Sequence, residues 1–282
     1  MSLKYPEDIK ERVEGAVTDI CVDSAGDIWV SVEQKGVFRI SSKGEVLSFQ
    51  DFSQVMNFIG MLYVDPSDIV WGVSTSGDGG VFKYDRGKSR FEFFPILEDG
   101  KKIPVSALAI TCDSHGDYWL GTWESGIIKF DGRTGEGEYI VDAGNAGDVW
   151  HIHSIEEYSP SMLLVGSDSG LTLIDRNSGE CHVYKSDELN SQSLTDRFVY
   201  PITRDSDGGF WIGTYYRGVN YLSRDFKRFQ RWRHSRFANS VSGNVIARFC
   251  EDPSGNIWIG TADGGLCPVS YTHLTLPTTS RV

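Results

Sequence analysis

The stretch Asp205-Ser-Asp-Gly-Gly-Phe-Trp211-Ile-Gly-Thr214 recurs along the chain with its Asp, Trp and Gly positions in register. Close copies begin at four other aspartates, each followed by a Trp six residues later: Asp23, Asp65, Asp113 and Asp252. A degenerate copy, Met162–Ser167, fills the remaining gap with Leu164 in the Trp position. The six Trp or Leu positions lie 42 to 48 residues apart. The chain is therefore built from repeats of about 46 residues.

Each repeat has the pattern of four short strands, named a to d in chain order. An alternating apolar run precedes the Asp, as in Val17–Val22 and Val245–Cys250, and predicts strand a. The Asp-x-x-Gly turn predicts a tight hairpin, because Asp accepts hydrogen bonds from backbone N–H groups and Gly adopts positive φ. The Trp that follows this turn then lies on strand b. Strand c is expected at Gly36–Ile40, Gly126–Phe130 and Gly218–Leu222, and the more polar strand d at Phe91–Phe94 and Lys227–Trp232.

This pattern predicts an all-β fold, a β-propeller of four-stranded antiparallel blades. The sixth copy ends inside strand c near Cys267, so we expect five complete blades, a truncated sixth and a ring that is not closed. The blades occupy 17–268. Residues 1–16 form an N-terminal segment in which Leu3–Tyr5 is a candidate outer strand of a preceding blade. Residues 269–282 fit no repeat and resemble translated sequencing adapter, so we expect a non-native tail.

Composition limits the possible functions. The chain has 27 Lys and Arg against 39 Asp and Glu, a formal net charge of −12, which disfavours nucleic-acid binding. No apolar run is long enough for a membrane helix, and the first 17 residues lack the apolar centre of a signal peptide. Five cysteines show no Cys-x-x-Cys spacing; Cys21, Cys112 and Cys250 are expected at equivalent, buried strand a positions.

Two blocks carry a family resemblance. Residues 190–214 and 239–261, each running from Asn-Ser to Trp-Ile-Gly-Thr, resemble the two-component regulator propeller repeat. The resemblance implies the periplasmic sensor of a bacterial hybrid two-component histidine kinase, which senses glycans. It also implies an immunoglobulin-like domain, a membrane span, and kinase, receiver and regulator domains in a full-length protein, for which a homodimer is a candidate assembly. None of these later parts is in this chain, so no enzymatic activity is expected of it.

Candidate ligand-binding residues lie where the loops meet one face of the blades, because propeller ligands usually contact loops at a channel mouth. Large aromatic residues beside a charge suit stacking and hydrogen bonding to an oligosaccharide, although packing between blades explains each of them equally well. The candidates on the b–c loops are Trp123, Glu124, Tyr215, Tyr216 and Arg217. Those on the segments leading into strand a are Asn57, Trp150, Arg197 and Asn244.

Other chemistry is less well supported. His151 and His153 are two apart on an expected strand a and so face one side, but they have no third ligand, and we expect no metal, cofactor or catalytic group. The Asp turns lack the calcium-loop spacing. The basic stretch Arg224–Phe237 suits either an anionic sugar or a charged edge strand.

Two alternatives stay open. The turn and Trp pattern also resembles virginiamycin B lyase-like propellers, which use a channel-mouth His and a divalent ion. A protein-binding scaffold would instead expose an apolar patch.

Overall fold

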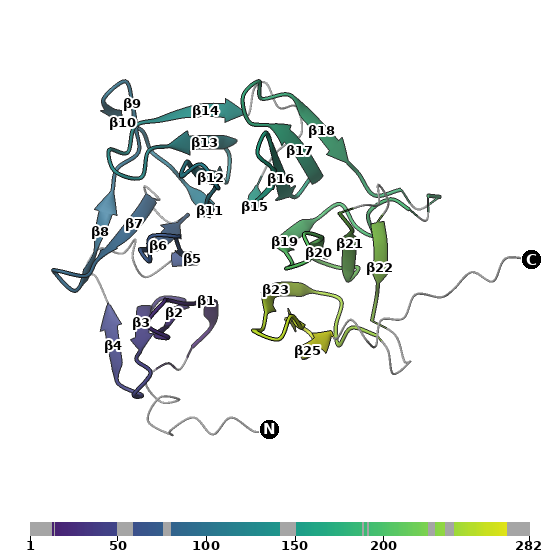
Figure 1. Cartoon of the computed structure of the whole chain (residues 1–282), viewed down its shortest axis with the longest axis horizontal. Helices are drawn as coiled ribbons and strands as arrows, with labels where there is room; N and C mark the ends of the chain where they lie inside the picture. The colour runs from purple at the N-terminus through teal and green to yellow at the C-terminus, as the bar shows by residue number, and fades with distance from the viewer. Residues whose placement is uncertain are drawn as a thin grey trace, which may run out of the picture. The chain divides into compact units, whose positions relative to one another are not determined.

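A computed structural model describes residues 13, 15–49, 59–75, 80–141, 151–187, 189–190, 192–224, 229–234 and 240–269. Within these ranges the regular structure consists of strands, which confirms the all-β prediction. Since the described ranges contain no helix, they offer no apolar helix of the length that a membrane crossing requires. Figure 1 shows the blades as separate small sheets.

The chain divides into two compact units, Met1–Ile155 and Glu156–Val282, and the division falls inside strand β15. The first unit holds three four-stranded antiparallel blades with strands in sequential order. Blade 1 comprises β1 (Val17–Val22), β2 (Ile28–Val32), β3 (Gly36–Ile40) and β4 (Val46–Phe49). Blade 2 comprises β5 (Ile59–Val64), β6 (Val70–Ser74), β7 (Gly80–Asp85) and β8 (Arg90–Phe94). Blade 3 comprises β11 (Ala107–Cys112), β12 (Tyr118–Thr122), β13 (Ile127–Phe130) and β14 (Gly137–Val141).

The remaining blades lie mainly in the second unit. Blade 4 comprises β15 (Ile152–Ser159), β16 (Met162–Ser167), β17 (Gly170–Asp175) and β18 (Cys181–Tyr184). Blade 5 comprises β19 (Val199–Arg204), β20 (Phe210–Thr214), β21 (Val219–Leu222) and β22 (Phe229–Trp232). Blade 6 has three strands, β23 (Ile246–Glu251), β24 (Ile257–Thr261) and β25 (Gly265–Val269). The described chain thus has the predicted five complete blades and truncated sixth. Leu3–Tyr5 and most of the predicted tail, 270–282, lie outside the described residues.

One element has no counterpart in the repeat pattern. A two-stranded hairpin, β9 (Leu97–Glu98) and β10 (Lys101–Lys102), lies between blades 2 and 3. Its turn places Asp99 at φ 52° and Gly100 at φ 71°, the left-handed conformations that an Asp-Gly hairpin turn needs. The strands are only two residues long, too short for a periodicity to predict them.

The recurring Asp and Trp are joined by side-chain hydrogen bonds. The Trp indole N–H donates to the Asp Oδ2 in all five copies, at 3.0 Å in blade 1, 2.8 Å in blade 2, 2.7 Å in blade 3, and 3.0 Å in blades 5 and 6. The Oδ1 of Asp113 accepts the backbone N–H groups of His115 and Asp117 at 2.9 and 3.1 Å. The Oδ1 atom therefore holds the turn, as the sequence predicts, and the Oδ2 atom joins the turn to the Trp of strand b, a bond that the sequence analysis did not predict.

The Trp side chains bury the faces between successive blades. Trp71 of blade 2 is fully buried and packs against Ile110, Leu120 and Phe130 of blade 3. In blade 4 the buried Leu164 takes the Trp position and packs against blade 5. A single blade could not bury both of its faces, so neighbouring repeats supply the core.

The predicted equivalence of three cysteines is wrong for one of them. Cys21 and Cys250 lie opposite the Trp of strand b, whereas Cys112 lies opposite Tyr118. Cys112 directly precedes its Asp while the other two stand one residue earlier, and a shift of one residue in a strand turns the side chain to the other face. The predicted burial fails for Cys250, which is exposed, while Cys21 and Cys112 are half-buried.

Candidate functional site

In blades 3 and 5 the b–c loop lies against the segment that leads into strand a of the same blade. The N–H of Trp123 donates to the carbonyl of Ser106 at 2.8 Å, and the N–H of Tyr215 donates to the carbonyl of Phe198 at 3.1 Å. The two kinds of candidate loop therefore share one end of each of these blades, as the sequence predicts. Asn57 and Trp150 lie outside the described residues.

The blade 3 loop carries a stacked aromatic pair. The rings of Trp123 and His151 lie with centroids 3.9 Å apart and planes 26° from parallel, and the His151 N–H donates to the Trp123 carbonyl at 3.2 Å. Trp123 stays 40% exposed, with the exposed Glu124 beside it in sequence. His151 has φ 49° and precedes β15, so it is not part of the strand. The predicted shared strand face of His151 and His153 therefore does not form.

The blade 5 loop carries a larger group, named here the blade 5 aromatic cluster: Arg197, Phe198, Tyr200, Tyr215 and Tyr216. The Tyr215 ring lies 5.0 Å from Tyr200 and 4.6 Å from Tyr216, edge to face with the latter. The Phe198 ring lies 5.9 Å from Tyr216, and the Arg197 guanidinium lies 4.4 Å above Phe198. Tyr216 is 58% exposed, so the cluster presents an aromatic surface beside a cation.

A buried carboxylate holds this cluster in place. Asp196 accepts the backbone N–H of Arg197 at 2.7 Å through Oδ1 and that of Tyr216 at 3.1 Å through Oδ2. The Thr214 hydroxyl accepts the N–H of Arg217 at 3.2 Å. These bonds fix both segments that present the side chains, so a ligand would meet a preformed surface.

The Tyr200 side chain of this cluster is a neutral phenol. Burial raises the pKa of Tyr200 to about 12, and the nearby charge of Asp168 adds to the shift. The hydroxyl is therefore protonated at neutral pH and remains a hydrogen-bond donor.

Asn244, on the segment that leads into β23, contacts the end of the blade 5 b–c loop. Its carbonyl accepts the N–H of Gly218 at 3.1 Å, and its side-chain oxygen accepts the N–H of His234 at 3.3 Å. These two bonds join the loop to the segments at 234 and 244.

Beside this loop three arginines, Arg217, Arg231 and Arg233, line a small pocket of about 180 Å³. Arg231 on β22 donates to the carbonyls of Ser193 and Asn190, both at 2.8 Å. Burial and the neighbouring Arg233 lower the pKa of Arg231. The site residues chosen from sequence omit Arg231 and Arg233, although the basic stretch contained them; their convergence on Arg217 needs the β21–β22 pairing.

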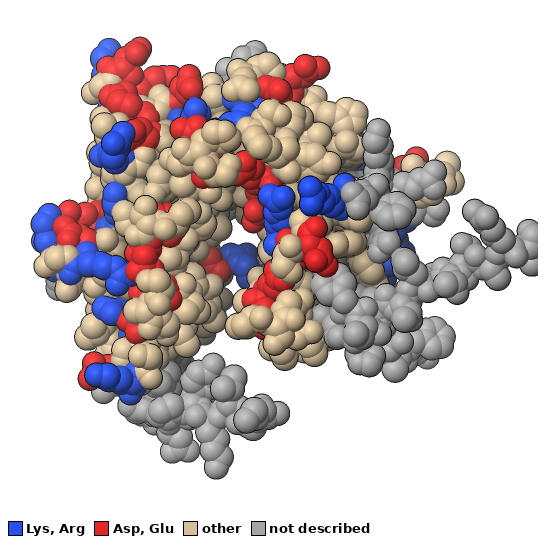
Figure 2. All heavy atoms as spheres, viewed as in Figure 1, with Lys and Arg blue, Asp and Glu red and all other residues tan. Residues whose placement is uncertain are grey.

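The wider surface agrees with the acidic composition. Figure 2 shows Asp and Glu side chains spread over the visible face with Lys and Arg between them. Among the described residues, no three His, Cys, Asp or Glu side chains gather as a metal site would require.

Comparison with known proteins identifies the repeats. Residues 193–216 and 240–263 match the family model described as two component regulator propeller. These two segments are similar to two-component regulator propeller repeats. The matched segments include the strand a segment and b–c loop that form the blade 5 aromatic cluster, and the corresponding parts of blade 6. No curated protein sequence matches the chain.

Solved structures share the fold at low identity. The extracellular domain of the putative hybrid two component system BT3049 from B. thetaiotaomicron is 18% identical with a TM-score of 0.60, over 91% of this chain and 40% of that one. Virginiamycin B lyase from Staphylococcus aureus is 12% identical with a TM-score of 0.68, over 92% and 82%. PorZ of Porphyromonas gingivalis is 18% identical with a TM-score of 0.66, over 92% and 40%. These similarities show a β-propeller, and the chain spans about two fifths of the BT3049 extracellular domain.

Proposed function

We propose that this chain is a ligand-sensing propeller region of an extracytoplasmic two-component sensor, and that it binds an oligosaccharide non-covalently. The observation that carries the proposal is the blade 5 aromatic cluster, where the exposed Tyr216 adjoins Arg197 and the three-arginine pocket. The cluster lies within the segments that match the two-component regulator propeller family.

The chemistry of the cluster suits a sugar. Aromatic faces stack on the apolar C–H face of a pyranose ring, and guanidinium and phenol groups hydrogen-bond its hydroxyls. The loop is held by backbone bonds to Asp196, so little conformational entropy is lost on binding.

The signalling role comes from the repeats. Sensor propellers of this kind would sit outside the cytoplasm, in the periplasm, and pass ligand binding to a histidine kinase and to transcription through parts of the protein beyond this region. The similarity to extracellular domains of two-component systems supports that placement. We propose no activity on nucleic acid and no catalysis by the region itself.

A binding screen tests the proposal. The chain is screened by thermal shift against neutral and acidic oligosaccharides, and hits are measured by calorimetry, since a ligand that binds the folded state raises Tm. Tyr216→Ala should weaken binding about tenfold or more, the loss expected for one stacking aromatic. Tyr184→Ala removes another exposed tyrosine of the same unit and should leave affinity unchanged. If the two variants bind equally well, the blade 5 aromatic cluster is not the site.

The same screen separates a sensor from a lyase. The similarity to virginiamycin B lyase covers 82% of that enzyme, which makes it the second candidate. Hits and lactone substrates are incubated with and without Mg²⁺ and analysed by mass spectrometry. Recovery of the ligand unaltered supports the sensor. Consumption that needs the metal and is lost in His151→Ala or His153→Ala would establish the lyase instead.

A further inference from the structure

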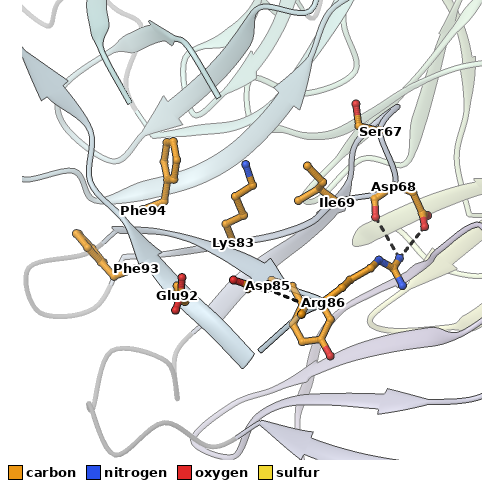
Figure 3. Close-up of a pocket in the computed structure, with 11 residues that line it drawn as sticks. Ser67, Asp68, Ile69, Lys83, Asp85, Arg86, Glu92, Phe93 and Phe94 are labelled. Carbon is orange, nitrogen blue, oxygen red and sulfur yellow. Dashed lines mark hydrogen bonds and ion pairs between the residues drawn. The ribbon is translucent and has the colours of Figure 1, made fainter. Parts of the chain in front are cut away.

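A second, larger pocket lies on blade 2, in the first unit. It encloses about 670 Å³, the size of a small-molecule site, and opens between the β5–β6 turn and strands β7 and β8. Figure 3 shows Lys83 pointing into it between Ile69 and Phe94, with Phe93 at one side. The walls thus combine an ammonium group with aromatic and aliphatic surface.

The two neighbouring blades show what partners the equivalent cation there. In blades 1, 2 and 3 the residue on strand c opposite the Trp is basic: Arg39, Lys83 and Lys129. The Nε of Arg39 donates to Asp27 at 2.7 Å, and the ammonium of Lys129 lies 2.9 Å from Asp117. Both aspartates stand four residues after the turn Asp, so the two blades on either side of blade 2 share one cation–carboxylate pair.

Blade 2 lacks that counter-charge. Ile69 occupies the position of the partner Asp, four residues after Asp65. The Lys83 ammonium instead donates to the carbonyl of Gly132 at 3.1 Å and lies 4.7 Å from the Trp71 ring centroid and 5.5 Å from that of Phe94. No salt bridge joins it to a carboxylate of the described residues, and Figure 3 draws no interaction from it to the other lining residues.

The acidic groups around the pocket are already paired. Asp68 lies 2.6 Å from Arg86, and Lys88 lies 2.8 Å from Glu92 and 3.4 Å from Asp85. Each of these carboxylates has a basic partner at the rim. Among the described residues that line the pocket, Lys83 is therefore the charged side chain without a counter-ion. It is half-buried beside the Trp71 ring, where an ion pair is less screened than in open water.

We infer that this pocket binds a small organic acid, whose carboxylate takes the place that Asp27 and Asp117 hold in the neighbouring blades. The ammonium has donors left after its bond to Gly132, and a carboxylate would satisfy them. The body of the ligand lies against Ile69 and the Phe94 ring. Phe93, 43% exposed with the Lys102 ammonium 4.3 Å from its ring centroid, adds apolar surface at the side. This site is independent of the blade 5 aromatic cluster, so either site can fail its test without the other.

The test uses benzoate as the probe, with benzamide as its neutral isostere and acetate as the acid without a ring. Ligand-observed saturation-transfer NMR on the full chain measures binding of each. Benzoate should bind, and benzamide and acetate should bind at least about tenfold more weakly, because the first lacks the charge and the second the apolar body.

Three variants assign the site. Lys83→Met removes the ammonium and should abolish benzoate binding. Ile69→Asp restores the ion pair of the repeat, and should abolish benzoate binding while raising Tm. Lys129→Met removes the matching cation of blade 3, where Asp117 already fills the site, and should leave binding unchanged. Equal binding of benzoate and benzamide, or undiminished benzoate binding by a folded Ile69→Asp protein, would overturn the proposal.

Discussion

Replacing Asp205 by alanine removes three hydrogen bonds from one turn. Its Oδ1 accepts the N–H groups of Asp207 and Gly209 at 3.1 and 2.8 Å, and its Oδ2 accepts the indole N–H of Trp211 at 3.0 Å. Trp211 is 2% exposed and Gly209 is buried, so these two donors lose their partner without gaining water. Each costs about 1–3 kcal/mol, so the two together lower the free energy of unfolding by about 2–6 kcal/mol.

A double-mutant cycle isolates the indole bond. Asp205→Ala, Trp211→Phe and the double variant are unfolded in urea and followed by circular dichroism. Because Trp211→Phe removes the hydrogen-bond donor, Asp205→Ala should destabilise the Trp211→Phe protein less than it destabilises the parent. The expected coupling energy is about 1–3 kcal/mol. Ser206→Ala, an exposed change in the same turn, is the control and should stay within about 0.5 kcal/mol of the parent.

The result that refutes this reasoning is additivity. If the stability losses of the two single variants sum to the loss of the double variant within about 0.5 kcal/mol, the Asp–Trp hydrogen bond makes no measurable contribution to stability. The recurrence of the pair would then reflect the turn alone, and not a bond that joins the turn to the core between blades.

Three further outcomes are expected. Gly135→Ala should lower the free energy of unfolding by about 3 kcal/mol, because φ is +81° and the new Cβ would lie 2.2 Å from a backbone carbonyl oxygen. Gly26→Ala has a similar φ of +77° but its Cβ meets open space, so it should cost only about 1 kcal/mol. Urea unfolding of the two variants measures the difference. Burial raises the pKa of Cys21 to about 12, so iodoacetamide at pH 8 should modify it far more slowly than the exposed Cys250, as peptide mapping will show; equal rates would contradict the burial. Burial raises the pKa of Glu156 to about 7, so ionisation opposes folding as pH rises from about 4.5 towards 7. Glu156→Gln should therefore raise the free energy of unfolding by about 1–3 kcal/mol at pH 8 and have little effect at pH 4, and an equal effect at both pH values would contradict this.

Several parts of the candidate site were open to prediction from sequence and others were not. Trp123, Tyr215 and Tyr216 stood out because other b–c loops of the repeat carry smaller residues, such as those at 262–265. The stack of His151 on Trp123 was not predictable, since it depends on the left-handed backbone of His151 before β15. The unpaired Lys83 did leave a sequence signal, the Ile that replaces an Asp in the aligned repeat.

The repeat, the blades and their turns can be predicted from the sequence alone, because these depend on contacts between residues a few positions apart: an Asp six residues before its Trp, and Gly where the turn needs positive φ. Tertiary structure decided which side chains converge. Arg217 and Arg231 meet in one pocket because β21 pairs with β22, and Lys83 reaches the carbonyl of Gly132 on the next blade. Such contacts depend on strand register and on the packing of one blade against the next, and spacing along a single repeat does not encode them.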